Sequence, residues 1–157
     1  HYAWILHFVG RFDHAIATAT TVIKRSPHFW RWYYNLALSL IAIGRSEHAA
    51  KAIEVAVALN DQGLLLAILS HALALSGKKD RAHATMAQLR ATNTYVSPYW
   101  QAYAAVGQAC YDCALHHLAE SVSMRDWFVL FLKHEPAFAA LRRLAAFDNL
   151  RFSVGLP

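Results

Sequence analysis

Charged residues are scarce in this chain of 157 residues: they make up 16% of it, whereas globular proteins carry about 25%. Cysteine is almost absent, and two cysteines cannot build a disulfide framework. The chain also lacks an apolar run of the roughly 18 residues that span a membrane, a glycine-rich phosphate loop, a signal-peptide pattern and a strand pattern. These absences argue against a disulfide-stapled secreted domain and a membrane protein, and they indicate a helical, cytoplasmic chain.

Apolar residues are abundant instead. They make up 57% of the chain, and aromatic residues alone make up 13%. We expect part of this surplus to form a surface for a partner, or for a missing part of the same protein. The net charge is +5, but the basic residues are spread over turns and helix ends rather than clustered on one face. Nucleic acid is therefore expected only through a missing domain.

Small residues recur at a regular spacing along the chain. Gly or Ala is followed five residues later by Ala in four copies: Gly10 and Ala15, Gly44 and Ala49, Gly77 and Ala82, Ala109 and Ala114. Seven residues before each copy stands another small residue: Ala3, Ala37, Ser70 or Ala102. The copies lie 34, 33 and 32 residues apart. This period is typical of stacked helix pairs, whose crossing points we expect to be formed by these small residues.

Turn residues and apolar periodicity predict where the helices lie. The expected helices span about residues 2–9, 13–25, 29–43, 46–59, 64–76, 79–91, 98–108 and 111–123. Gly44 is expected as a C-terminal cap, Ser46 as an N-cap and Pro98 as a first-turn residue. The first helix would be truncated, so we expect the chain to be the C-terminal piece of a longer polypeptide.

This spacing resembles the tetratricopeptide repeat, in which a small residue, a turn Gly, a second-helix Ala and a closing Pro recur over about 34 residues. Pro27 matches the closing Pro after the first copy, whereas Asp61 and Thr94 replace it later. Ala109 stands where the fourth turn Gly is usual, which leaves that turn open to a different geometry. The resemblance covers about residues 1–123. It implies an all-α, right-handed solenoid of four antiparallel helix pairs.

The tail looks like the C-terminal end of bacterial signalling proteins that carry such arrays. The residues concerned are Tyr95-Val96-Ser97-Pro98-Tyr99, Trp127, Leu132-Lys133-His134-Glu135-Pro136, Phe138, Leu141-Arg142, Phe147 and Gly155-Leu156-Pro157. Ala146 departs from the Arg that usually precedes the Phe. In those proteins the array often follows a winged-helix DNA-binding domain, a nucleotide cyclase domain or a protein kinase domain. We expect residues 124–157 to be capping helices of the same domain, with Phe138, Leu141, Leu144 and Phe147 covering the last pair.

One cluster of side chains could carry chemistry. Cys110, Cys113 and His117 fall near one face of an expected helix and could supply three zinc ligands. A redox CxxC pair is a second interpretation. The favoured interpretation is structural, with Cys113 as a small buried residue beside Ala114. No second Cys/His pair stands at zinc-finger spacing, and we expect no metal, no cofactor and no enzyme activity in this fragment.

The resemblance also places a concave groove along the first helix of each pair. Its predicted partner-binding residues are Arg31, Tyr34, Asn35, His71, Tyr99, Trp100 and Tyr103. Only Arg31 and Asn35 resemble the residues that clamp C-terminal carboxylates, so a full clamp is not expected. The aromatic lining suits an amphipathic helix or an apolar peptide. The alternative is that Tyr34 and Trp100 serve mainly in packing between repeats.

These features predict a protein–protein interaction module, as the regulatory or sensory arm of a larger bacterial signalling or transcription-regulating protein. The partner would be a protein or peptide, including another domain of the same polypeptide. Two alternatives stay open. The fragment could dock on an attached nucleotide cyclase or protein kinase domain, or it could be a self-associating structural scaffold.

Overall fold

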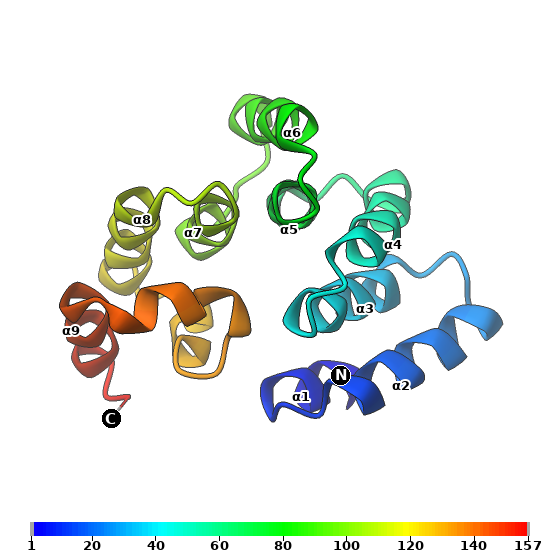
Figure 1. Ribbon diagram of the computed structural model, residues 1–157, viewed down its shortest axis with the longest axis horizontal. Coiled ribbons are helices and arrows are strands. Elements are labelled where there is room, and N and C mark those ends of the chain that lie inside the picture. Colours follow the sequence, from blue (N-terminus) through cyan, green and yellow to red (C-terminus); the bar gives the residue numbers. More distant parts are fainter. Residues whose placement is uncertain (1, 157) are drawn as a thin grey trace.

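The computed structural model describes residues 2–156, and within that range the chain is all-helical, with no strand. Figure 1 shows the helices following one another along an arc, with the tail returning to its inner side. The α-helices are α1 (Tyr2–Phe8), α2 (Phe12–Arg25), α3 (Trp30–Ala42), α4 (Ser46–Leu59), α5 (Gly63–Leu75), α6 (Lys79–Ala91), α7 (Pro98–Gly107), α8 (Tyr111–Ser123) and α9 (Ala145–Ser153). Two 3₁₀ helices, η1 (Trp127–Phe131) and η2 (Pro136–Arg143), lie between α8 and α9. The predicted helices are thus confirmed to within a few residues at each end.

The four repeated turns share one backbone conformation. Gly10, Gly44 and Gly77 have φ of 77°, 76° and 78°, and Ala109 follows them with φ of 57°. In each turn the next N–H donates to the carbonyl five residues earlier: Arg11 to Leu6, Arg45 to Leu40, Lys78 to Leu73 and Cys110 to Ala105. A single residue in the left-handed conformation thus ends each helix, and glycine adopts this conformation without steric cost. The fourth turn therefore keeps the geometry of the others, although Ala109 carries a Cβ.

The small repeated residues are buried. Ala3, Ala15, Ala37, Ala49, Ser70, Ala82, Ala102 and Ala114 all have 0% exposure. Consecutive helices pack against each other at these points, with α3 on α4, α5 on α6 and α7 on α8. In the second of these contacts the Ser70 hydroxyl donates to the Ala82 carbonyl at 3.1 Å. A larger side chain at such a crossing would overpack it, at a cost of about 1–3 kcal/mol.

Helices α5 and α7 approach each other closely at Gly107. A Cβ added to Gly107 would lie 2.6 Å from Cα of His71. Only glycine lets the two backbones come so near. This contact joins α5 to α7, two helices that are not consecutive in the chain.

The tail folds back across the inner side of the arc, where Figure 1 shows η1 and η2 in orange. Phe138, Leu141 and Phe147 are buried, and η2 contacts α7, α3 and α9. Segment η1 reaches the first helix, where Phe131 lies against Trp4 with ring centroids 4.7 Å apart. Three of the four residues of the predicted apolar stripe are therefore buried, whereas Leu144 is half-buried. The tail also contacts the start of the chain.

Some expectations need correction or fall outside the described range. Ser46 is the first residue of α4, Arg45 occupies the cap position, and no side chain caps that helix. Ser97 does cap α7, because its hydroxyl accepts from the Tyr99 N–H at 3.2 Å. His1 and Pro157, the outer limits of the two expected units, lie outside the described residues. Across residues 2–156, no helix has both the length and the apolar character that a membrane crossing requires.

Candidate functional site

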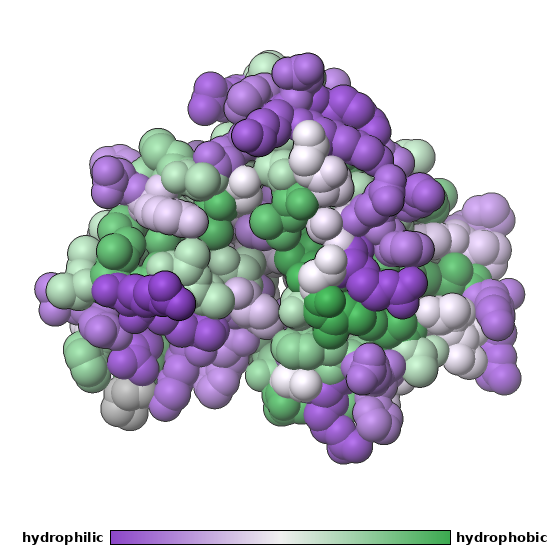
Figure 2. All heavy atoms as spheres, in the orientation of Figure 1, coloured by the Kyte–Doolittle hydropathy of each residue, from purple (hydrophilic) through white to green (hydrophobic). Residues whose placement is uncertain are grey.

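A pocket of about 950 Å³ opens between the start of α3, α1 and the tail. We call it the aromatic groove. It is lined by Trp4, Phe29, Trp30, Arg31, Trp32, Tyr34, Asn35, Gln62, Leu64, Trp127 and Phe128. Figure 2 shows a hydrophilic outer surface over α6, with hydrophobic residues exposed nearer the middle of the molecule. The groove is large enough for several side chains of a bound segment.

The wall of the groove comes mainly from one short stretch of sequence. Phe29 has extended backbone with φ of −98°, and α3 starts at the next residue. The first turns of α3 therefore present several aromatic rings in quick succession. Phe29 is 47% exposed, whereas Trp30 and Trp32 are half-buried. Such rings offer a large apolar contact area at little cost in side-chain entropy.

Arg31 is the one charged residue among those that line the aromatic groove. It is exposed, and its guanidinium carbon lies 5.1 Å from the centroid of the Trp30 ring. Stacking on an aromatic face holds the guanidinium in place while leaving its N–H groups free to donate. The groove is therefore apolar with a positive charge at its rim.

Tyr34 and Asn35 form the floor of the groove. Tyr34 is half-buried, and its ring meets that of Trp100 edge-on at 6.1 Å. Burial raises the pKa of the Tyr34 hydroxyl well above its usual range, so the group stays neutral. Asn35 is buried, and its Oδ1 has no hydrogen-bond partner among residues 2–156. The side-chain amide oxygen of Asn35 is thus a free hydrogen-bond acceptor beside the pocket.

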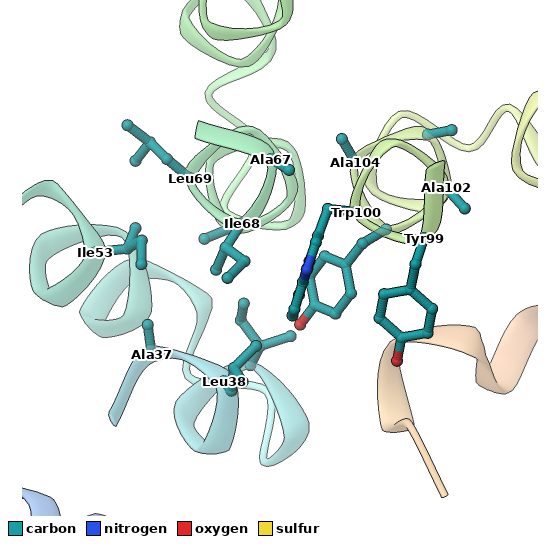
Figure 3. Close-up of a cluster of buried hydrophobic side chains, with 14 of the residues drawn as sticks. Ala37, Leu38, Ile53, Ala67, Ile68, Leu69, Tyr99, Trp100, Ala102 and Ala104 are labelled. Atoms are coloured by element: carbon teal, nitrogen blue, oxygen red, sulfur yellow. The ribbon is translucent and has the colours of Figure 1, made fainter. Parts of the chain in front are cut away.

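The other half of the predicted groove is filled by the protein's own tail. Tyr99, Trp100 and Tyr103 are buried, and together with Phe128 and Phe138 they form what we call the aromatic cluster. The Tyr99 ring stacks on Phe128 and meets Phe138 edge-on, with centroids 5.3 Å apart in both cases. Figure 3 shows Trp100 extending from α7 toward Leu38 and Ile68, while Tyr99 points to the tail. These three predicted residues therefore pack in the interior. For Trp100 this agrees with the alternative interpretation, in which it serves mainly in packing.

His71 is also buried rather than exposed to a partner. Its Nδ1–H donates to the Tyr103 carbonyl at 2.7 Å, and its ring lies 4.6 Å from that of Tyr103. Burial lowers the pKa of His71 and outweighs the opposing effect of this hydrogen bond. His71 therefore acts as a neutral link between α5 and α7. Of the seven predicted residues, Arg31, Tyr34 and Asn35 line the aromatic groove, and the other four lie behind it.

The sequence reasoning missed a buried polar contact that holds the tail in place. Glu135 and His7 are both buried, with carboxyl Oε2 3.8 Å from imidazole Nε2. His7 Nδ1 in turn forms a 3.3 Å hydrogen bond with the hydroxyl of Ser39. Glu135 Oε1 also accepts from the N–H of Ala137 and so caps η2. The signal in the sequence was weak, namely a Glu directly before Pro136 at the start of a short helix.

Glu135 also affects the hydroxyl groups of the aromatic cluster. Burial raises the pKa of Tyr99 and Tyr103 well above the usual range, and the nearby carboxyl of Glu135 raises them further. Both hydroxyls lack a hydrogen-bond partner within the described part of the chain. The tail therefore brings a carboxyl group close to a set of neutral phenols in the interior.

The cysteines differ from the favoured structural interpretation. Cys110 and Cys113 form a disulfide at the start of α8, and Cys113 is exposed rather than buried. The interpretation of Cys113 as a small core residue is therefore wrong, because it faces outward while Ala114 beside it makes the crossing. His117 does share a pocket with both cysteines, as the helix spacing predicted. Among residues 2–156, no group of three or more His, Cys, Asp or Glu is placed to hold a metal ion.

No protein family, curated protein or solved structure matches the chain.

Proposed function

We propose that this chain is a protein–protein interaction module that binds an apolar peptide segment in the aromatic groove. The observation that supports this most is the pocket of about 950 Å³ with its aromatic walls. None of the described residues that line the groove is acidic, and Arg31 stands at its rim. The segment that fits best carries apolar or aromatic residues with one acidic group to pair with Arg31.

The architecture that we propose for this function is a right-handed, tetratricopeptide-like solenoid. Four left-handed turns at spacings of 34, 33 and 32 residues, each followed by a buried Ala, support it. We further propose the role suggested by the resemblance of the tail, a regulatory arm of a bacterial cytoplasmic signalling or transcription-regulating protein. In that role the bound segment would come from a partner or from another domain of the same polypeptide.

The affinity would depend on a few anchors. Aromatic residues at the centre of an interface often lose about 2 kcal/mol or more of binding free energy when truncated. Phe29 is the best residue to test, because it lines the groove and is already 47% exposed. Its removal should therefore change binding with little effect on folding. Phe152 is 59% exposed and does not line the groove, which makes it a matched control.

The experiment starts with selection of displayed random dodecapeptides on the immobilised chain. Selected peptides should be rich in apolar and aromatic residues and contain an acidic side chain or C-terminal carboxylate. Fluorescence anisotropy with one selected peptide should then give a Kd that rises by about tenfold or more for Phe29→Ala. Arg31→Ala should weaken binding and reduce its dependence on salt, whereas Phe152→Ala should bind like the parent chain.

Two results would count against the aromatic groove. Selected peptides that bind Phe29→Ala and the parent equally well would place the binding surface elsewhere. Selected peptides that lack an acidic group and bind the Arg31→Ala variant as tightly as the parent would contradict the proposed pairing with Arg31. Circular dichroism of each variant checks that the helices are retained.

A second candidate, self-association, is supported by an apolar stripe along α1 and the residue that follows it. Tyr2, Ile5 and Val9 are 64%, 50% and 62% exposed and lie at helical spacing. Two copies of the chain could bury this stripe against each other. Sedimentation velocity would detect such a dimer, and Ile5→Ser should return it to a monomer. A monomer at all concentrations would leave the aromatic groove as the better-supported surface.

A further inference from the structure

The disulfide at the start of α8 closes a loop too short to stabilise the fold. Cys110 precedes α8 as its cap residue, and Cys113 lies in the first turn, with Cα atoms 5.3 Å apart. The stabilisation expected from a disulfide grows with the length of the chain that it closes, and here only two residues lie between the cysteines. The backbone of α8 already holds these residues, since the Ala114 N–H donates to the Cys110 carbonyl at 3.0 Å. Stability therefore does not explain the bond.

The two cysteines differ in their exposure to solvent. Cys113 is exposed, whereas Cys110 is half-buried. Both line a pocket of about 720 Å³ between α6, α7 and α8, together with His83, Met86, Arg90 and His117. An incoming thiolate would therefore meet Cys113 first.

The surroundings of the pair carry positive rather than negative groups. The N-terminus of a helix and nearby cations lower the pKa of a cysteine, as does the CxxC arrangement itself. Arg90 lines the pocket, and no acidic residue does. Asp112 lies between the two cysteines in the sequence and acts against this effect, but it is exposed and does not line the pocket.

We propose that Cys110 and Cys113 are a reversible redox pair that exchanges electrons with a dithiol of a partner protein docked in this pocket. A partner thiolate attacks Sγ of Cys113, and the Cys110–Cys113 bond breaks. The electron pair leaves on Sγ of Cys110, which takes a proton from solvent. The partner's second thiolate attacks the partner sulfur of the mixed disulfide and expels Cys113 as a thiolate, which takes a second proton from solvent. The partner dithiol is oxidised to a disulfide, and the cysteine pair is reduced to two thiols.

This role is independent of the aromatic groove, since neither cysteine lines it. It also agrees with a reducing compartment, where disulfides are generally transient and take part in catalysis or redox sensing. The reverse reaction makes the reduced pair a reductant of partner disulfides.

The first test follows the pair in the whole chain. The protein is equilibrated with mixtures of reduced and oxidised dithiothreitol, alkylated with iodoacetamide and weighed by mass spectrometry. We expect a single reversible transition between no adduct and two adducts, with an unchanged circular dichroism spectrum. A disulfide that is reduced only when the chain unfolds would overturn the proposal.

The second test separates the two cysteines. The remaining thiol of Cys110→Ser and that of Cys113→Ser are each mixed with the uncharged disulfide dithiodipyridine at neutral pH. Cys113 should react about tenfold faster than Cys110, because Cys113 is exposed and Cys110 is half-buried. In the Cys110→Ser background, Arg90→Glu should slow this reaction, whereas Lys79→Glu, on the same helix but outside the pocket, should not. Equal rates for the two cysteines would overturn the role given to Cys113.

The third test uses insulin as a protein disulfide. With dithiothreitol as the electron source, the parent chain should accelerate insulin reduction well above dithiothreitol alone, and Cys113→Ser should abolish the acceleration. The same rate with and without the chain would mean that the pair does not exchange with proteins.

Discussion

Glu135 in the tail places its carboxyl Oε2 3.8 Å from Nε2 of His7 on the first helix, and both side chains are buried. Phe131 makes a second, aromatic contact between the tail and α1, with its ring centroid 4.7 Å from that of Trp4 and 4.4 Å from that of Phe8. Helix α1 and the part of the tail around η1 and Glu135 therefore lie against each other.

Replacement of Glu135 should show how much this junction contributes to stability. Glu135→Ala removes both the group facing His7 and the cap of η2, which Oε1 makes by accepting from the Ala137 N–H at 3.1 Å. Glu135→Gln keeps an acceptor at that cap and a polar group beside His7. Urea denaturation should give a larger loss of unfolding free energy for Glu135→Ala, by about 1–3 kcal/mol. Equal stability of the two variants would mean that the polar contact contributes little.

The fourth turn offers a substitution that should stabilise the chain. Ala109 adopts φ of 57°, which costs an ordinary residue about 1–2 kcal/mol but costs glycine nothing. Ala109→Gly should therefore raise the free energy of unfolding by about 1 kcal/mol, after the added entropy of glycine in the unfolded chain is subtracted.

Gly77→Ala is the reciprocal control. A Cβ at Gly77 would have no heavy atom within 4 Å, so its cost is conformational alone. Thermal denaturation should show a lower melting temperature for Gly77→Ala and a higher one for Ala109→Gly. A drop in both would mean that the Ala109 turn is stabilised by contacts of its methyl group.

Burial of His71 should make stability depend on pH. Its pKa in the folded chain is below the usual value of about 6.5, chiefly because of burial. The unfolded chain thus binds a proton that the folded chain does not, so unfolding free energy is lost as pH falls below about 6.5. His71→Asn, whose amide can still donate to the Tyr103 carbonyl, should flatten this fall by up to about 1.4 kcal/mol per pH unit.

His117 provides a graded comparison. Its pKa is also lowered by burial, but its side chain is 29% exposed and Glu120 opposes the shift. His117→Asn should therefore flatten the pH profile less than His71→Asn does. Urea denaturation at several pH values between 5 and 8 measures both. An unchanged profile in His71→Asn would contradict the buried, neutral state of that residue.

The helices could be predicted from the sequence because their ends are set locally. Gly44 and Gly77 end helices by adopting positive φ, and Ser97 with Pro98 starts one, so each signal lies within a few residues of its effect. Ala109 was harder, since its left-handed turn depends on the two helices that it joins. The repeat spacing predicted the position of this turn but left its backbone conformation open.

The division of the predicted groove could not be read from the sequence. Its periodicity places Tyr34 and Trp100 on one inner face, and in the structure their rings do meet. The periodicity does not show which part of that face the tail covers. Phe128 and Phe138 are apolar, and an apolar side chain could fill many different buried sites. The exposure of Cys113 was missed for a related reason, since it depends on how α6 and α7 lie beside α8.

Phe138, which the tail contributes to the aromatic cluster, should matter strongly for the stability of the fold. Phe138 is buried between Tyr99, Tyr103 and Phe147, with ring centroids 5.3, 6.1 and 6.3 Å away. Truncation of such a side chain leaves a cavity, and Phe138→Ala should cost about 3–5 kcal/mol of unfolding free energy. Phe152→Ala removes the same atoms from a side chain that is 59% exposed, and surface changes of this kind usually stay within about 0.5 kcal/mol.

The fluorescence of Trp100 gives this comparison a local readout. Trp100 lies 5.5 Å from Tyr103 and 5.0 Å from Phe128 in the same cluster, and it is buried. If the tail detaches when Phe138 is truncated, water should reach this indole, and tryptophan emission should shift to longer wavelength before the helices melt. Because Trp100 is one of five tryptophans, the shift is measured against the same change in a Trp100→Phe background, where it should shrink. Equal stability of Phe138→Ala and Phe152→Ala, with no shift in emission, would mean that the tail is not held by the aromatic cluster.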